Sequence, residues 1–171
     1  MNKDDIIIRN YRESDSQTVG KIIAETFSKY NLGFATSEEK EKFLGPFHYA
    51  ESQEEKHIKD IADTIQASMV FVAECDGKIV GVLRGRSDQL QSLFVCESHH
   101  RRGIGRRLCE RFETACLLQG SLEIKVSASL YAVPFYAKMG YKKTTGIRNL
   151  RIFGCSGFPY QPMKKILTTQ D

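Results

Sequence analysis

"LQSLFVCESHHRRGIGRRLCERFETACLLQ" (residues 90–119) joins an apolar run to an amphipathic run through "HHRRGIGRRL" (99–108), which holds four arginines and a Gly-x-Gly. We predict that a strand ends at Val95 and that a helix begins near Ile104. The first N–H groups of a helix have no partner within it, and the helix dipole adds partial positive charge there. The turn is therefore suited to hold a pyrophosphate group.

Two glycines of this turn, Gly103 and Gly105, have no side chain to keep a ligand away, and we expect both to adopt positive φ. The turn is not a Walker loop, because no G-K-[ST] follows, and it is not the dinucleotide fingerprint, because position 108 is Leu. Three interpretations stay open at this point. The turn is a cofactor cradle, a nucleic-acid phosphate contact, or a plain glycine turn before a solvated basic helix.

Composition limits the classes of protein. The chain has 171 residues, 41% hydrophobic and 27% charged, which is typical of one globular domain with a core. A net charge of +4 is too small to predict nucleic-acid binding by itself. The N-terminal stretch lacks the apolar region of a secretory signal, and no apolar run approaches the roughly 18 residues of a membrane span. Five cysteines without a C-x-x-C predict no disulfide framework, no metal site and a cytoplasmic location.

Hydrophobic periodicity predicts the element order β-α-α-β-β-β-α-β-α-β-β. The expected strands are 6–12, 69–74, 79–86, 90–95, 121–127, 141–146 and 158–167. The expected helices are 13–30, 52–68, 104–119 and 131–140. We expect residues 31–50 to combine a short polar helix with aromatic residues and Gly45-Pro46 in an irregular, mobile connection. This order is typical of a mixed sheet with helices on both faces.

Three segments together resemble the GNAT superfamily of acetyl-CoA-dependent N-acetyltransferases, in its bacterial type. "AECDGKIVGVLRGRSDQLQSLFVCESHHRRGIGRRL" (73–108) is similar to the family's hairpin, fourth strand and cofactor loop. "VSASLYAVPFYAKMGYKK" (126–143) resembles its fifth strand and the helix with the FY-x-K-x-G-[FY] signature, and "GFPYQPMKKIL" (157–167) its closing strand. The resemblance implies one GNAT domain over 1–171, of class α/β (α+β). It also implies a central mixed, mostly antiparallel sheet of about six to seven strands with helices on both faces.

The resemblance also implies which residues bind acetyl-CoA. The family's R/Q-x-x-G-x-G/A loop falls on His100, Arg101, Arg102, Gly103, Ile104 and Gly105, with Arg106 next. The first of these is His rather than Arg or Gln, and we expect binding to survive because main-chain N–H groups hold the phosphates. The strand segment that pairs with the pantetheine arm falls on Leu93, Phe94 and Val95. Ser129 stands near the position where many members have Asn, and a hydroxyl could substitute for that contact.

Tyr136 falls on the tyrosine of the FY pair, which in the family donates a hydrogen bond or a proton to the departing CoA thiolate. The general base is left open. Many members place Glu or His on the fourth strand, but the matching positions are Gln89 and Gln91, whose amides cannot accept a proton as bases. The other candidates are carboxylates and imidazoles elsewhere in the chain: Asp88, Glu123, His48 and His57.

The resemblance implies direct transfer of the acetyl group to an amine of a small molecule or peptide. We expect Cys96 to be a bystander thiol. Four aromatic residues either line an acceptor pocket or pack a loop onto the sheet: Tyr30, Phe34, Phe47 and Tyr49. We expect no nucleic-acid, membrane or metal partner, and a homodimer is left open. The alternatives are a CoA-binding sensor without turnover and a module that binds the phosphate backbone of nucleic acid.

Overall fold

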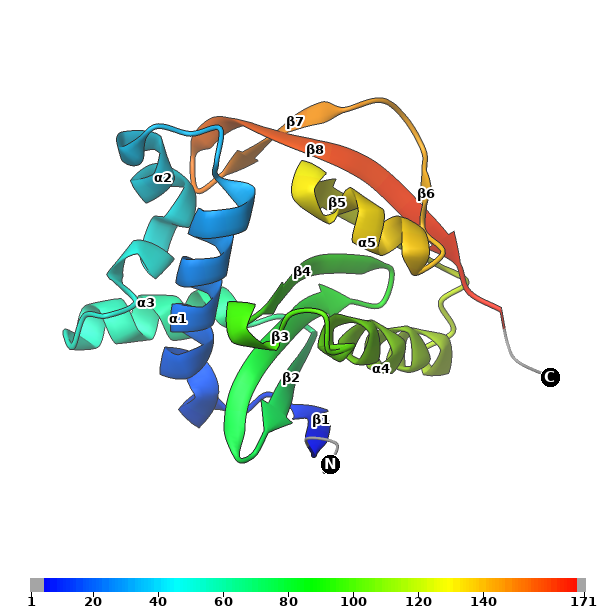
Figure 1. Ribbon diagram of the computed structural model, residues 1–171, viewed down its shortest axis with the longest axis horizontal. Helices are drawn as coiled ribbons and strands as arrows, with labels where there is room; N and C mark the ends of the chain where they lie inside the picture. The colour runs from blue at the N-terminus through cyan, green and yellow to red at the C-terminus, as the bar shows by residue number, and fades with distance from the viewer. Residues whose placement is uncertain (1–4, 169–171) are drawn as a thin grey trace.

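A computed structural model describes residues 5–168 as an open sheet of eight strands with helices (Figure 1). The strands follow the order β1-β2-β3-β4-β5-β8-β6, and β7 also pairs with β8. Among the strand pairs within residues 5–168, β4 and β5 alone run parallel. The strands are β1 Ile6–Asn10, β2 Met69–Cys75, β3 Lys78–Arg86, β4 Gln89–Val95, β5 Glu123–Ser129, β6 Lys142–Lys143, β7 Arg148–Ile152 and β8 Cys155–Ile166. The expected mixed, mostly antiparallel sheet is confirmed.

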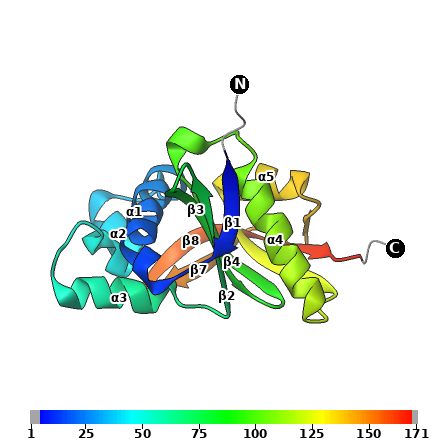
Figure 2. The same cartoon turned by 90° about the horizontal axis from the view of Figure 1, so that it is seen from below.

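Helices cover both faces of the sheet, as Figure 2 shows. One face carries α1 Ser16–Thr26, α2 Ser37–Leu44 and α3 Glu55–Ile65, and the other carries α4 Ile104–Leu118 and α5 Val133–Lys138. Successive side chains of a strand point to opposite faces. Accordingly, Phe71 and Leu83 pack in the core under α4, while Val72 and Val82 pack in the core under α1. Within residues 5–168, no helix combines the length and the apolar character that a membrane span requires.

Two expectations for this fold were wrong in detail. The eighth strand, β7, was not expected, because four of its five residues are exposed and its sequence shows no alternation. The segment 31–50 is more regular than expected: α2 is the short polar helix anticipated there, and a 3₁₀ turn at Gly45–Tyr49 follows it directly. Thr36 and Glu39 cap the start of α2 reciprocally, and Phe43 of α2 and Phe47 of the 3₁₀ turn are both buried.

The strands β4 and β5 pair over only two residue positions, Gln89 with Lys125 and Leu90 with Val126. The register between β3 and β4 shifts at the next position, so Gln91 has no counterpart on β3. Beyond this point β4 continues to Val95 without a partner on β5. The carboxyl ends of the two strands therefore stand apart and leave room for a ligand between them.

Candidate active site

A cavity of about 640 Å³ lies at the end of β4, beside the segment that follows β5. Its walls are the end of β4, the turn before α4, the helix α5 with the 3₁₀ turn before it, and the turn after α1. Most of the site residues expected from the sequence line it together: Leu93, Phe94, Val95, His100, Arg101, Gly103, Ile104, Gly105, Arg106 and Tyr136. Two do not line it, namely Arg102 and Ser129.

The turn before α4 has the geometry of an anion cradle. Arg101 and Gly103 adopt left-handed backbone, with φ of +63° and +78°, and Gly103 caps the helix. The N–H group of Arg107 is bonded to the carbonyl of Gly103 at 3.1 Å. The N–H groups of Ile104, Gly105 and Arg106 come before it and have no intrahelical acceptor. These three N–H donors therefore lie at the positive end of the helix dipole, on residues that line the cavity.

Gly105 departs from the expectation of positive φ. It lies in the first turn of α4, and its φ is not in the left-handed region. A Cβ atom at this position would lie 3.2 Å from Cε2 of Phe135, on α5. A side chain at 105 would therefore require the ring of Phe135 to shift, so close packing of α4 on α5 favours glycine there. At Gly103 a Cβ would meet nothing within 4 Å, and the requirement there is the backbone conformation.

His100 links the turn to the end of β4. Its Nε2 atom is 2.7 Å from the carbonyl oxygen of Val95. A carbonyl oxygen only accepts, so Nε2 carries a proton and donates it. The imidazole also lies 5.1 Å from the ring of Tyr30, measured between centroids. The residue that replaces the Arg or Gln of the family's loop therefore fixes the turn against the strand.

The electrostatics of the cavity favour an anionic ligand. Arg101, Arg106 and Lys138 line it together with the imidazoles of His99 and His100. Among the residues of 5–168 that line the cavity there is no aspartate or glutamate. Cations of this kind, beside a helix N-terminus, match the phosphate groups of a nucleotide.

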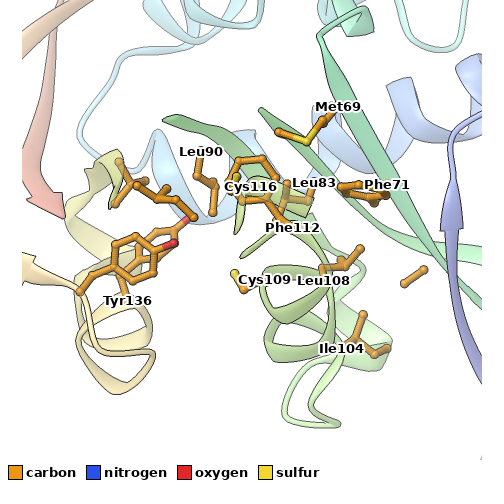
Figure 3. Packing of buried hydrophobic residues seen from close by; sticks show 14 of the residues in the cluster. Met69, Phe71, Leu83, Leu90, Ile104, Leu108, Cys109, Phe112, Cys116 and Tyr136 are labelled. Carbon is orange, nitrogen blue, oxygen red and sulfur yellow. The ribbon is translucent and has the colours of Figure 1, made fainter. Parts of the chain in front are cut away.

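Tyr136 is held in the cavity wall by a short helix. The helix α5 contains Pro134 in its first turn, where a missing N–H costs nothing, and it ends before Gly140, whose φ is +92°. The ring of Tyr136 is 4% exposed and belongs to the same buried cluster as Cys109 of α4 (Figure 3). Burial, and secondarily the charge that Cys109 can carry, raises the pKa of Tyr136 well above its ordinary value. The hydroxyl is thus protonated at neutral pH and available as a donor.

The candidate bases lie elsewhere. Asp88 is 3.3 Å from Arg86, and Glu123 is 3.3 Å from Lys164, so both carboxylates are in ion pairs. Gln89 accepts a hydrogen bond from Arg86 at 2.9 Å. None of these residues lines the cavity, and neither does Gln91.

The two remaining histidine candidates also stand away from it. His57 stacks on Tyr49 at 4.0 Å. His48 lines a separate, open depression of about 700 Å³ beside α1, where lysines and glutamates balance one another. That depression lacks a glycine turn and a helix N-terminus, so we assign the chemistry to the cavity between β4 and β5.

Of the four aromatic residues considered for an acceptor pocket, only Tyr30 lines the cavity, where its ring is 5.0 Å from that of Tyr131. Phe47 is 4% exposed and belongs to the core under α1. Phe34 packs edge-on against Phe43 at 5.8 Å. Core packing therefore explains Phe47, whereas Phe34 and Tyr49 are about half exposed and lie outside the cavity.

The structure adds lining residues that the sequence did not indicate: Thr26, Asn31, His99, Tyr131 and Lys138. Asn31 ends a π-helical turn, Phe27–Asn31, and donates from Nδ2 to Oγ of Ser129 at 2.5 Å. These two residues are 98 positions apart, so no local pattern could have paired them.

A family model described as "Acetyltransferase (GNAT) domain" matches residues 24–167. The chain belongs to the GNAT acetyltransferase family. Membership supports acetyl transfer as the class of reaction of this GNAT protein. No match was found among curated protein sequences.

Solved structures share the fold of this GNAT protein. A GCN5-related N-acetyltransferase from Rhodopseudomonas palustris aligns with a TM-score of 0.76 at 23% identity, over 98% of this chain and 99% of that one. PaiA N-acetyltransferase from Thermoplasma acidophilum, in complex with coenzyme A, aligns with a TM-score of 0.70 at 19% identity, over 95% and 99%. Ard1 from Thermoplasma volcanium aligns with a TM-score of 0.66 at 18% identity, over 96% and 99%. At these identities the likeness shows the fold.

Proposed function

We propose that this GNAT protein transfers the acetyl group of acetyl-CoA directly to an amine of a small molecule or peptide, as one acetyltransferase domain. The observation that carries the proposal is the shared cavity, in which three features meet: the cationic turn at Arg101–Arg106, the end of β4 that has no partner on β5, and the hydroxyl-bearing ring of Tyr136. That a structural neighbour is a complex with coenzyme A supports the choice of ligand.

The residues fit coenzyme A chemically. Its pyrophosphate matches the three unbonded N–H groups at the start of α4, and Arg101, Arg106 and Lys138 supply positive charge for its phosphates. The pantetheine arm is peptide-like, and the backbone of Leu93–Val95 has no partner on β5. We expect the arm to lie along this backbone in place of a strand, with its thioester toward Tyr136.

The chain's own groups then have defined tasks in transfer. Acetyl-CoA supplies the activated acetyl group. Backbone N–H groups near Leu93–Val95 hold the thioester oxygen as negative charge develops on it. A carbon–nitrogen bond forms to the amine while the carbon–sulfur bond breaks, and Tyr136 donates a hydrogen bond to the departing sulfur. The amine loses one proton, and the thiolate gains one.

The proton of the amine has no carboxylate to go to within the part of the cavity that the structure describes. A primary amine has a pKa near 10.4 and is mostly charged at neutral pH. We therefore propose that solvent removes this proton, and that only the small neutral fraction of the amine reacts. The rate then depends on pH through the acceptor.

One experiment tests the proposal and the alternatives together. Thiol release from acetyl-CoA is measured over a panel of amines, polyamines, aminoglycosides and peptides, and binding of desulfo-CoA is titrated by calorimetry on the same preparation. We expect desulfo-CoA binding and amine-dependent thiol release. Binding without release over the whole panel favours a sensor. Failure to bind desulfo-CoA, combined with tight DNA binding that falls steeply with salt, supports the nucleic-acid alternative and contradicts the proposal.

A further inference from the structure

The π-helical turn Phe27–Asn31 crosses the opening between the ends of β4 and β5. On the β4 side, Lys29 forms an ion pair with Glu97 at 2.6 Å, and the ring of Tyr30 lies against that of His100. On the β5 side, the ring of Tyr30 lies against Tyr131, and Asn31 is bonded to Ser129. We call this segment the crossing turn. It touches both edges of the gap in which a pantetheine arm would lie.

Asn31 is the residue of the crossing turn with unused hydrogen-bonding groups in the cavity. Its Nδ2 donates to Oγ of Ser129, the last residue of β5, at 2.5 Å. A side-chain amide has two N–H donors and one oxygen acceptor. Within residues 5–168 the bond to Ser129 is the side chain's one hydrogen bond, so one N–H and the oxygen remain. Asn31 lines the cavity, whereas Ser129 does not.

The gap needs such a group on its β5 side. The backbone of Leu93–Val95 has no partner on β5 and can bond a peptide-like arm from one edge. Within residues 5–168, no residue of β5 lines the cavity, so the strand does not meet the arm's other edge there. Each amide of a pantetheine arm has one N–H and one carbonyl, and leaving either unpaired on burial costs binding free energy. The amide of Asn31 offers the complementary donor and acceptor.

We propose that the side-chain amide of Asn31 binds an amide of the pantetheine arm, and that Ser129 is the positioning residue that holds Asn31 toward the gap. The inference rests on the proposed function, because it names a binding group for the same ligand. It assigns to the crossing turn, 98 residues before Ser129 in sequence, a direct contact with the cofactor that the end of β5 does not make by itself.

The test compares two ligands by calorimetry on the full chain. Desulfo-CoA carries the pantetheine arm, and 3′-phosphoadenosine 5′-diphosphate has the same nucleotide without it. We expect Asn31→Ala to weaken desulfo-CoA binding about tenfold, as the loss of one or two hydrogen bonds does, and to change the affinity for the nucleotide less than twofold. Asn149→Ala is the matched control, because Asn149 is exposed on β7, and we expect it to change neither affinity.

Ser129→Ala gives a second measurement that leaves Asn31 in place. We expect about threefold weaker desulfo-CoA binding, unchanged nucleotide binding, and a double variant no weaker than Asn31→Ala, since Ser129 acts through Asn31. If Asn31→Ala does not fold, Ser129→Ala tests by itself whether the amide of Asn31 binds the pantetheine arm.

Equal weakening of both ligands would overturn the assignment and make Asn31 a structural residue of the crossing turn. Unchanged desulfo-CoA binding in Asn31→Ala, or in Ser129→Ala if that is the folded variant, would also overturn it. Failure of the wild-type protein to bind desulfo-CoA would overturn the proposed function and this inference with it.

Discussion

Gly105 and Phe135 are packed so closely that a Cβ atom on the glycine would lie 3.2 Å from Cε2 and 3.3 Å from Cζ of the ring. Gly105 belongs to the first turn of α4, which carries the N–H groups of the anion cradle, and Phe135 precedes Tyr136 in α5. This contact therefore packs the segment that we assign to the phosphates directly against the helix that carries the group we assign to the thiol.

Replacing the two glycines of the turn should have different consequences. Gly105→Val forces branched carbons into Phe135, and we expect the free energy of unfolding to fall by about 1–3 kcal/mol and acetyl-CoA binding to weaken at least tenfold. Gly103→Ala meets no neighbour but holds alanine at a φ of +78°, which costs about 1 kcal/mol. Urea unfolding of both variants measures the free energy of unfolding, and calorimetry measures their affinity for acetyl-CoA. Unchanged acetyl-CoA affinity in a folded Gly105→Val protein would show that the contact does not shape the site.

The rate of transfer should rise with pH without a descending limb from Tyr136. Burial raises the pKa of its phenol well above the ordinary value near 10, so the hydroxyl keeps its proton throughout the range in which an amine is deprotonated. With a primary amine as acceptor, we expect kcat/KM to rise about tenfold per pH unit from pH 6.5 to 9. The measurement is the pH–rate profile of wild type and Tyr136→Phe. A falling limb centred between pH 7.5 and 9.5 that disappears in the Phe variant would show that Tyr136 titrates there.

A stability prediction concerns Asp15, whose carboxylate accepts from Arg9 at 2.8 and 3.1 Å and from the N–H group of Arg12 at 2.7 Å. Burial alone would raise the pKa of Asp15, but these hydrogen bonds outweigh it and lower the pKa. A carboxylate with a lowered folded-state pKa stabilises the fold above its unfolded pKa of about 3.9, and this stabilisation is lost as pH falls through the folded value.

Asp15→Asn should therefore lower the free energy of unfolding by about 1–3 kcal/mol at pH 7, and the difference from wild type should shrink below pH 4. Urea unfolding at both pH values provides the comparison, with Glu13→Gln, an exposed neighbour, as the control. A difference that grows on acidification would contradict the assignment of the ion pair.

The sequence predicted the parts of this protein that depend on local signals. The strand at 90–95, the glycine turn and the helix from Ile104 each follow from neighbouring residues, and the structure has them at Gln89–Val95, Gly103 and Ile104–Leu118. The capping, the left-handed glycine and the unpaired N–H groups are properties of a short segment. These features can therefore be predicted from the sequence without the structure.

What the sequence did not predict depends on contacts between distant segments. The need for glycine at 105 comes from Phe135, and the position of Asn31 comes from Ser129. The strand β7 was missed because most of its side chains are exposed and pairing with β8 alone places it in the sheet. Contacts of this kind, between segments far apart in the sequence, decide which polar groups reach the cavity. The residue types alone do not indicate these contacts.

The central claim is that Tyr136 assists departure of the CoA thiol in an acetyl transfer to an amine. A phenol has a pKa near 10 and a thiol near 8.5, so complete proton transfer to a free thiolate is uphill by at least about 2 kcal/mol, and burial of Tyr136 increases this cost. The hydroxyl therefore acts mainly by donating a hydrogen bond to sulfur as charge builds up on it. That interaction exists chiefly in the transition state, so its loss lowers the rate and spares ground-state binding.

The measurement that tests this most directly is amine-dependent thiol release by Tyr136→Phe, with acetyl-CoA binding titrated on the same preparation. The substitution keeps the ring and its packing against Phe135 and Tyr141. We predict that kcat falls by roughly 10²-fold while the affinity for acetyl-CoA changes less than about threefold. A folded Phe variant with kcat near that of wild type would contradict the account and leave Tyr136 as a packing residue.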